Sequence, residues 1–198
     1  MLLSIVTPTY KRLRYIKKNL ITFNLLHLTF KSFEWIIILE KKDKKTLEFL
    51  RKNKKKFIRM IIGNQTSVEQ AFEKGIKISK GKYINFHGDD DFFDPKNLSF
   101  INKKLFLNKS KWIVFYGDYI NDQFKVVRKI ISFIKRLLLN NHHKIDLSLV
   151  NYIMTPSVFV MRKIFVKMGG FGSIKRSGSD YLFWMKLKKK YNPKVIKK

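Results

Sequence analysis

This 198-residue chain lacks several features, and each absence excludes a class of protein or site. It has no cysteine, which excludes disulfides, zinc–thiolate sites, iron–sulfur clusters and a thiol nucleophile. Its longest apolar runs, such as 35–39, are strand-sized and fall well short of the roughly 18 residues that cross a bilayer. The first residues have neither a basic start nor a cleavage site. We therefore expect no signal peptide and a cytoplasmic protein, with peripheral attachment to the inner face of the cytoplasmic membrane left open.

Acidic residues are scarce, at 14 against 43 lysines and arginines, which gives a formal net charge of +29. Such a charge is typical of proteins that bind an anionic membrane or nucleic acid. However, lysine outnumbers arginine by 35 to 8, and the residues encoded by AT-rich codons are abundant. We favour compositional drift as the cause of this charge, and attraction to an anionic membrane as the second explanation. Nucleic acid is an unlikely partner, because phosphate and base recognition prefer the arginine fork.

Apolar segments separated by turn signals predict an alternation of strands and helices. The predicted strands are 2–7, 34–39, 57–62, 82–87, 112–116 and 157–161. The alternation predicts an α/β fold with a doubly wound, mixed but mostly parallel sheet and helices on both faces. In such sheets, ligands bind outside the carboxyl ends of the strands.

Local signals also predict where helices begin and end. Ser67, three residues before Gln70, predicts a helix N-cap, and Gly81 predicts the end of that helix. Asp94 followed by proline predicts the start of another helix. A last amphipathic helix is expected after Ser179, and its expected core positions are Tyr181, Leu182, Met185 and Leu187.

The acidic residues that do occur are concentrated at one predicted strand end. Asp89, Asp90, Asp91 and Asp94 lie within six positions, and only Asp94 has a helix to cap. Adjacent carboxylates repel one another unless a cation is present. Mg²⁺ and Mn²⁺ prefer oxygen ligands and join carboxylates to substrate phosphates. We therefore favour metal and phosphate binding here over a polar turn that merely balances nearby lysines.

Four segments follow one another along nearly the whole chain: SIVTPTYKR, EWIIILE, GIKISKGKYINFHGDDDFFDP and YIMTPSVFVMRKIFVKMGGFGSIKRSGSDYLFWMKL. In this order they resemble family 2 glycosyltransferases. The first two are similar to the family's first two strands, and the third to its D-x-D metal signature. The fourth is similar to the segment in which Gly-Gly-Phe precedes the catalytic carboxylate.

The resemblance implies a GT-A fold in a single domain, 1–198, with a nucleotide-sugar half at 1–116 and an acceptor and catalytic half at 117–198. It implies a divalent cofactor, Mn²⁺ or Mg²⁺. The implied site residues are Thr7, Pro8, Tyr10, Glu40, Asp89 and Asp90 for the donor, Asp90 and Asp91 for the metal, and Asp180 as general base. Tyr10 is equally compatible with a place at the rim. Asp180 has an alternative role as a favourable charge at a helix N-terminus.

Some positions depart from the family pattern. Gly88 stands in the first slot of the D-x-D signature, and Glu40 replaces the aspartate that contacts the nucleotide base. The Gly-Ser-Thr that usually follows is missing, and so is the Q-x-x-R-W pattern of processive synthases. We therefore expect a compact, non-processive enzyme.

The implied activity is inverting transfer of a sugar from a nucleotide-diphosphate donor, UDP by preference, to a hydroxyl of a saccharide or lipid-linked acceptor. The implied pathway is surface polysaccharide, lipopolysaccharide or capsule synthesis. The alternative is a basic protein that binds nucleic acid or membrane on a degenerate, non-catalytic glycosyltransferase scaffold.

Three further features lie outside the motifs. In residues 128–139, isoleucines and leucines fall on one helical face and basic residues flank them. Such a helix can dock over the sheet or lie in a membrane interface, and we favour docking over the sheet. His87 is expected to be buried and hydrogen-bonded, and Trp184 to pack in the core.

Overall fold

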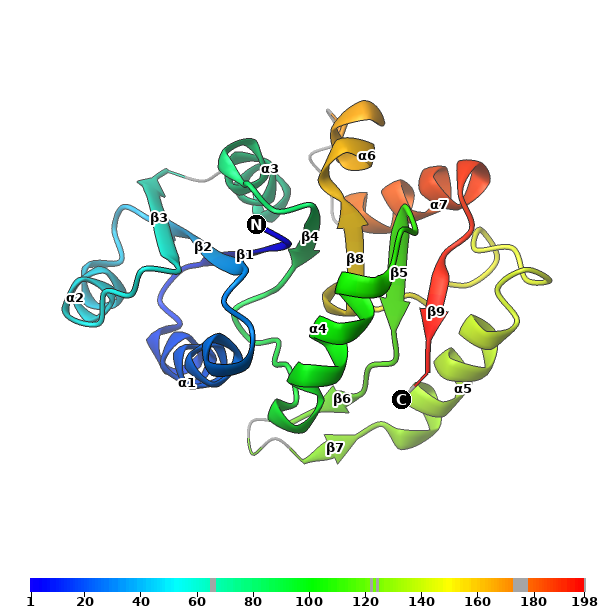
Figure 1. Cartoon of the computed structure of the whole chain (residues 1–198), viewed down its shortest axis with the longest axis horizontal. Coiled ribbons are helices and arrows are strands. Elements are labelled where there is room, and N and C mark those ends of the chain that lie inside the picture. The colour runs from blue at the N-terminus through cyan, green and yellow to red at the C-terminus, as the bar shows by residue number, and fades with distance from the viewer. Residues whose placement is uncertain (65–66, 122, 124, 173–177, 198) are drawn as a thin grey trace.

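The computed structural model describes residues 1–64, 67–121, 123, 125–172 and 178–197 (Figure 1). Along the first half of the chain the elements are β1 (Leu3–Thr9), α1 (Leu13–Thr29), β2 (Phe33–Glu40), α2 (Lys44–Lys52), β3 (Ile58–Gly63), α3 (Val68–Ile78), β4 (Tyr83–Phe86), η1 (Pro95–Asn97) and α4 (Leu98–Leu107). The remaining elements are β5 (Trp112–Phe115), β6 (Tyr119–Ile120), β7 (Val126–Val127), α5 (Lys129–Asn140), η2 (Thr155–Ser157), β8 (Val158–Met161), α6 (Arg162–Lys167), α7 (Ser179–Lys190) and β9 (Lys194–Ile196).

One seven-stranded sheet with the order β3-β2-β1-β4-β8-β5-β9 forms the centre of the molecule. Only β8 runs antiparallel to its neighbours β4 and β5, so the other six strands share one direction. This confirms the predicted mixed, mostly parallel sheet. Because those six strands are parallel, their carboxyl ends lie along one edge.

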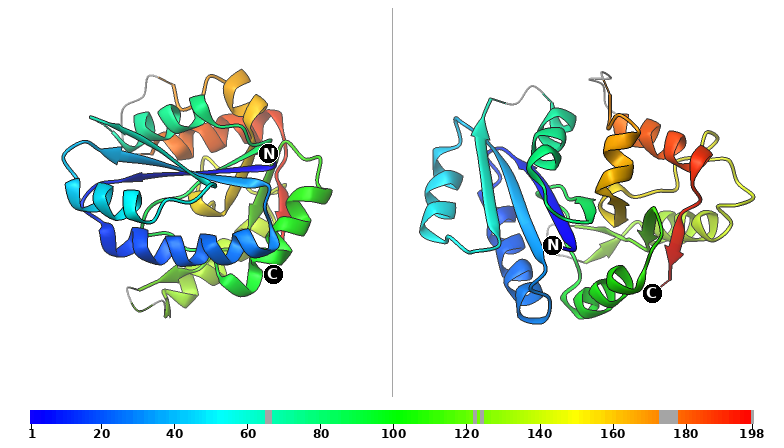
Figure 2. Two further views of the ribbon diagram at one scale, coloured as in Figure 1. Left: turned by 60° about the vertical axis from the view of Figure 1, so that its left-hand side comes forward. Right: turned by 45° about the horizontal axis from the view of Figure 1, so that its top comes forward.

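Helices cover both faces of the sheet, as predicted. Figure 2 shows α1, α2 and α4 on one side and α3, α6 and α7 on the other. Side chains of a strand alternate between the faces, and an aromatic cluster forms on each. On one face Phe23 of α1 contacts Trp35, with ring centroids 4.7 Å apart. On the other, Phe86 contacts Trp184 at 5.4 Å, and Trp184 is fully buried as expected.

The helix signals are confirmed at most positions. The Ser67 hydroxyl accepts a hydrogen bond from the backbone N–H of Gln70 at 3.2 Å. Asp94 accepts one from the N–H of Lys96, but the helix that it starts is the short η1, and α4 follows. Of the expected core positions in α7, Leu187 is buried, whereas Leu182 is exposed.

Gly81 has a different role from the predicted helix stop. The helix α3 ends at Ile78, and Ser79 is its C-cap. A Cβ at Gly81 would lie 2.4 Å from the backbone nitrogen of Ser4, which real Cβ atoms do not do. Glycine is therefore required because the chain passes very close to β1.

The helix α5 does not dock over the sheet by its apolar side, contrary to the favoured interpretation. Ile130, Ile131 and Ile134 are exposed, and its buried residues are Ser132 and Leu139. The helix is thus turned with its apolar side outward. Among the described residues, no helix is both long and apolar enough to span a bilayer.

Candidate functional site

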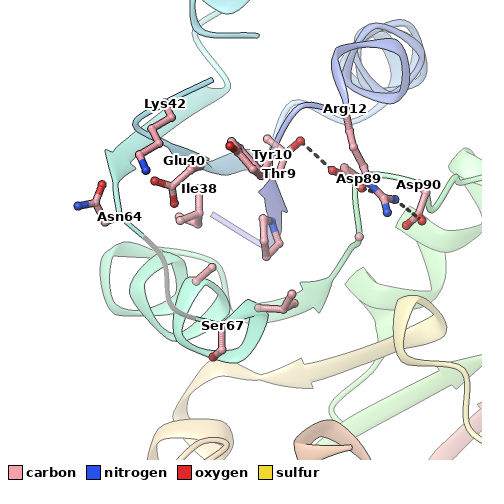
Figure 3. A pocket seen from close by; sticks show the side chains of 14 residues that line it. Thr9, Tyr10, Arg12, Ile38, Glu40, Lys42, Asn64, Ser67, Asp89 and Asp90 are labelled. Carbon is pink, nitrogen blue, oxygen red and sulfur yellow. Dashed lines mark hydrogen bonds and ion pairs between the residues drawn. The ribbon is translucent and has the colours of Figure 1, made fainter. Parts of the chain in front are cut away.

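A hollow of about 820 Å³ opens at the carboxyl edge of the sheet (Figure 3). Its walls come from the ends of β1 and β2, the start of α3 and the turn after β4. Five of the predicted donor-binding residues line it, namely Pro8, Tyr10, Glu40, Asp89 and Asp90. Sequence segments that lie far apart therefore meet where ligands bind in sheets of this kind.

Asp89 is the buried carboxylate of the turn after β4. Its Oδ2 accepts a hydrogen bond from the hydroxyl of Thr9 at 2.8 Å, and its backbone carbonyl accepts one from the Asn19 amide at 2.8 Å. Burial raises the pKa of Asp89, which the hydrogen bond from Thr9 and the charge of Arg12 partly offset. Asp89 thus fixes the turn to both β1 and α1.

His87, at the start of the same turn, belongs to this network. Its Nε2 lies 3.2 Å from Oδ1 of Asn19. Because the Asn19 amide group donates to Asp89, its oxygen accepts, so His87 carries the proton on Nε2. Burial lowers the pKa of His87 to about 4, which keeps the ring neutral. The expectation of a buried, hydrogen-bonded histidine is confirmed.

Asp90 is exposed at the mouth of the hollow and faces Arg12 (Figure 3). Nη1 of Arg12 lies 2.7 Å from Oδ2 of Asp90 and 3.4 Å from Oδ1 of Asp89. The hydrogen bond from Arg12 to Asp90 and the nearby charge of Asp89 raise the pKa of Arg12. Sequence analysis missed Arg12, because nothing local shows which carboxylate an arginine will reach.

The glycine in the first slot of the acidic signature leaves a notch between two carboxylates. A Cβ at Gly88 would lie 2.8 Å from Oδ2 of Asp91 and 3.1 Å from Oδ1 of Asp90. Oδ2 of Asp91 also accepts the backbone N–H of Gly88 at 2.7 Å, and burial raises the pKa of Asp91 to about 7. Two carboxylate oxygens therefore converge on space that any other residue would fill. This cradle fits a small divalent cation whose remaining ligands come from a bound phosphate and water.

The described residues contain no group of three or more acidic or histidine side chains already arranged to hold a metal. A site made of Asp90 and Asp91 thus depends on a ligand to supply further oxygens. Arg12 must also give up its contact with Asp90 to any cation bound there.

Thr7 does not line the hollow, contrary to the prediction. Its side chain is fully buried, and its hydroxyl accepts a hydrogen bond from the Trp35 indole N–H at 2.9 Å. Alternation along β1 turns Thr7 toward the core and the neighbouring Pro8 toward the hollow. Thr7 therefore braces the strand and does not contact a ligand in the hollow.

Asp43 shapes the loop at the rim, a role that no motif in the sequence predicts. It caps α2 through the backbone N–H of Thr46 at 3.2 Å and accepts the N–H of Lys11 at 2.7 Å. Lys11 has a φ of +56°, a conformation that costs energy for a side chain other than glycine. The contact with Asp43 holds this turn and so sets the positions of Tyr10 and Arg12, which flank it.

Asp180 lies in the first turn of α7 and is tied to the same edge of the sheet. Its Oδ2 accepts a hydrogen bond from the hydroxyl of Thr155, and its Oδ1 accepts the N–H of Tyr181 at 2.8 Å. The adjacent Pro156 carbonyl accepts the amide of Asn85 in β4 at 2.8 Å. Because β4 leads directly into the acidic turn, Asp180 and that turn share the carboxyl edge. Thr155 is a second residue that sequence analysis missed.

Comparisons with known proteins bear on this arrangement. The profile of the family described as "Glycosyl transferase family 2" matches residues 4–177. An uncharacterized glycosyltransferase of Methanocaldococcus jannaschii is 27% identical over 197 residues, covering 93% of this chain and 64% of the relative. An uncharacterized glycosyltransferase of Haemophilus influenzae is 27% identical over 196 residues, covering 94% of this chain and 62% of the relative. The chain thus spans less than two thirds of the length of these relatives.

Solved structures show the same fold. Staphylococcus aureus TarS 1–349 superposes with a TM-score of 0.76 at 17% identity, covering 99% of this chain and 58% of the TarS 1–349 chain. TarS 1–349 in complex with UDP-GlcNAc superposes with a TM-score of 0.69 at 12% identity, covering 100% of this chain and 59% of the TarS 1–349 chain. A third structure is the mannosyltransferase PcManGT of Pyrobaculum calidifontis in complex with GDP-Man and Mn²⁺. It superposes with a TM-score of 0.67 at 12% identity, covering 99% of this chain and 54% of the PcManGT chain.

Proposed function

Because this chain belongs to glycosyltransferase family 2 and has the GT-A fold, we propose that it transfers a sugar from a nucleotide-diphosphate donor to an acceptor hydroxyl with inversion. The observation that carries the proposal is the placement of two acidic sites at one sheet edge. Asp90 lies at the mouth of the hollow, and Asp180 is tied to the same edge through Thr155 and Asn85. Inverting transfer needs two groups that act on opposite sides of one sugar carbon.

The donor occupies the hollow. Glu40, at the end of β2, accepts hydrogen bonds from the nucleotide base, and Tyr10 lies at the rim. The diphosphate faces Asp90 and Arg12. UDP is the favoured nucleotide, and the TarS complexes with UDP and UDP-GlcNAc support this choice for a chain of the same fold.

Asp90 and Asp91 would hold the divalent cation at the Gly88 notch, together with oxygens of the donor diphosphate. Bound there, Mn²⁺ or Mg²⁺ would neutralise the charge on the departing diphosphate. The Mn²⁺ in the PcManGT complex supports a metal in this role. Arg12, released from Asp90, is then free to approach the diphosphate.

Asp180 is the general base. It accepts the proton of the acceptor hydroxyl, whose oxygen attacks the anomeric carbon from the side opposite the diphosphate. The hydrogen bonds from Thr155 and from the N–H of Tyr181 fix the orientation of its carboxyl group. A positioned base of this kind contributes about 10²- to 10⁴-fold to the rate.

The acceptor is a saccharide or a lipid-linked saccharide, handled by the 117–198 half beside the nucleotide-sugar half, 1–116. A surface polysaccharide, lipopolysaccharide or capsule pathway in the cytoplasm is the proposed setting. A nucleic-acid module that presents an exposed sheet face is not supported, because helices cover both faces of the large sheet.

Isothermal titration with UDP, with and without Mn²⁺, tests the donor site. We expect binding that depends on Mn²⁺ and is weakened at least tenfold by Asp90→Asn. The matched control is Asp94→Asn, an exposed aspartate four positions away whose capping role asparagine preserves. If the folded wild type bound no nucleoside diphosphate with either metal, the proposal would fail.

A further inference from the structure

The helix α5 presents a continuous apolar surface to solvent. The exposed fractions of Ile130, Phe133, Ile134, Leu137 and Ile131 are 75%, 60%, 47%, 46% and 44%. With 3.6 residues per turn, Ile130, Ile134 and Leu137 form one line, and the other two lie on either side of it. Single exposed apolar residues are ordinary, but a contiguous group marks an interaction site. We call these five residues the α5 apolar face.

Polar contacts on the opposite side fix this orientation. Ser132 is buried, and its hydroxyl accepts the N–H of Tyr119 at 3.4 Å. The Tyr116 hydroxyl donates to Oδ1 of Asn140 at 2.6 Å, near the end of the helix. Turning α5 to bury its isoleucines would break these contacts and leave buried polar groups unpaired. The outward orientation is therefore a property of the fold.

Cationic side chains border the α5 apolar face, and α5 contains no acidic residue. The Arg128 and Lys135 side chains lie over the ring of Tyr119, with their charged groups 5.6 and 6.0 Å from its centroid. Beside the helix lies a hollow of about 680 Å³, lined in part by Lys125 and Lys129 and by Asp118, whose carboxylate pairs with Arg136 of α5. The surface thus has an apolar centre and a basic border.

A bilayer containing anionic lipids matches this surface, because isoleucine and leucine enter the acyl boundary while lysine and arginine reach the headgroups. A second copy of the chain fits poorly, since two surfaces with basic borders on molecules of charge +29 repel. Single-stranded nucleic acid fits poorly as well, because Phe133 is the one aromatic side chain of the face. We propose that α5 binds the surface of an anionic membrane through the α5 apolar face and its basic border.

The placement of α5 gives this binding a defined orientation. Tyr116 and Tyr119, which contact α5, follow the carboxyl end of β5. That end lies on the same edge of the sheet as the acidic turn and Asp180. Membrane binding through α5 would therefore place this edge beside the bilayer. The inference depends on α5 and not on the chemistry proposed for the hollow.

A single environment-sensitive label tests insertion directly. Because the chain has no cysteine, Ile130→Cys creates a unique attachment site for a nitrobenzoxadiazole dye. Leu28→Cys, on α1, is the matched control, since both positions are 75% exposed. We expect vesicles of phosphatidylglycerol and phosphatidylcholine to shift the emission of the dye at position 130 to the blue and to leave the dye at position 28 unchanged. No shift at 130, or equal shifts at both, would overturn the proposal.

Vesicle co-sedimentation separates the apolar and ionic contributions. We expect Ile130→Asn/Ile134→Asn to abolish binding and the control Ile21→Asn/Leu28→Asn to retain it. We expect Lys129→Gln/Lys135→Gln to lower the partition coefficient by about fivefold per charge, and more than the control Lys54→Gln/Lys55→Gln. The proposal of an anionic surface would fail if binding to pure phosphatidylcholine vesicles equalled binding to vesicles with phosphatidylglycerol. It would also fail if the two double lysine variants lowered binding equally. An α5-dependent dimer without vesicle binding, measured by light scattering, would identify a second copy as the occupant instead.

Discussion

The guanidinium of Arg12 lies 2.7 Å from the carboxylate of Asp90, across 78 positions of sequence. The two side chains are 48% and 55% exposed, so this ion pair is screened by solvent and weak. It nevertheless places a cationic group of the protein beside the carboxylate that is proposed to bind the metal. Arg12 would therefore compete with a divalent cation bound at Asp90.

Removing that competitor should strengthen metal binding in the absence of nucleotide. An exposed pair is worth about 0.2–1 kcal/mol, so we expect Arg12→Gln to bind Mn²⁺ up to about fivefold more tightly. Electron paramagnetic resonance of free Mn²⁺ measures this affinity. Arg14→Gln is the control, because Arg14 is exposed near Arg12 and donates to the Tyr15 hydroxyl. Unchanged or weaker binding by Arg12→Gln would show that Arg12 does not compete for the site.

The apolar pattern of the sequence predicted the sheet well, because buried parallel strands are continuous apolar runs that few other elements imitate. It failed for α5. Its spacing of isoleucines and leucines shows that one side of the helix is apolar, but not whether that side faces the sheet or the solvent. Ser132 and Asn140 decide this through contacts with Tyr116 and Tyr119, and such contacts leave no periodic signal.

The candidate site was predictable only in part, for a similar reason. The acidic turn and Asp180 stand in recognisable motifs, whereas their supporting residues do not. Thr155 reaches Asp180 over 25 positions, and Asp43 reaches Lys11 over 32. The error at Thr7 arose because a strand end alternates between the core and the pocket, and the motif alone does not give the phase of that alternation.

The buried position of Thr7 has a measurable consequence. Thr7→Val keeps the shape but leaves the buried Trp35 N–H without an acceptor, which costs about 1–3 kcal/mol. We expect this loss in the free energy of unfolding from urea titrations, with the affinity for UDP unchanged. Thr7→Ser, which keeps the hydroxyl, should lose less. If Thr7→Val instead weakened UDP binding and left the stability unchanged, Thr7 would be part of the donor site.

A buried carboxylate at the opposite edge of the sheet should make stability depend on pH. Glu34 accepts hydrogen bonds from Ser4 at 2.7 Å and from Arg59 at 2.8 Å. Although burial alone would raise the pKa of Glu34, these partners lower it below its ordinary value. A carboxylate whose pKa is lowered by folding contributes stability above its unfolded pKa, and that contribution is lost as the pH falls through the folded pKa.

Glu34→Gln should therefore be less stable than wild type at pH 7, by about 1.5–3 kcal/mol. The difference should shrink as the pH falls below about 4.5. Thermal or urea unfolding across this range measures it. Glu48→Gln, in an exposed pair with Lys52, should change stability little at any pH. A difference that is constant with pH would mean that the charge of Glu34 contributes nothing.

Asp180→Asn separates the proposed base from a role in the helix alone. Asparagine can accept the N–H of Tyr181 with its one side-chain oxygen and donate from its amide nitrogen to the Thr155 hydroxyl, so α7 and the donor hollow should remain intact. We expect turnover to fall about 10²- to 10⁴-fold, while Mn²⁺-dependent UDP binding stays within twofold. Thr155→Val removes a hydrogen bond that orients the carboxylate, so turnover should also fall while UDP binding stays unchanged. If Asp180→Asn lost stability and UDP affinity together, Asp180 would be a structural charge at the start of α7 and the base would lie elsewhere.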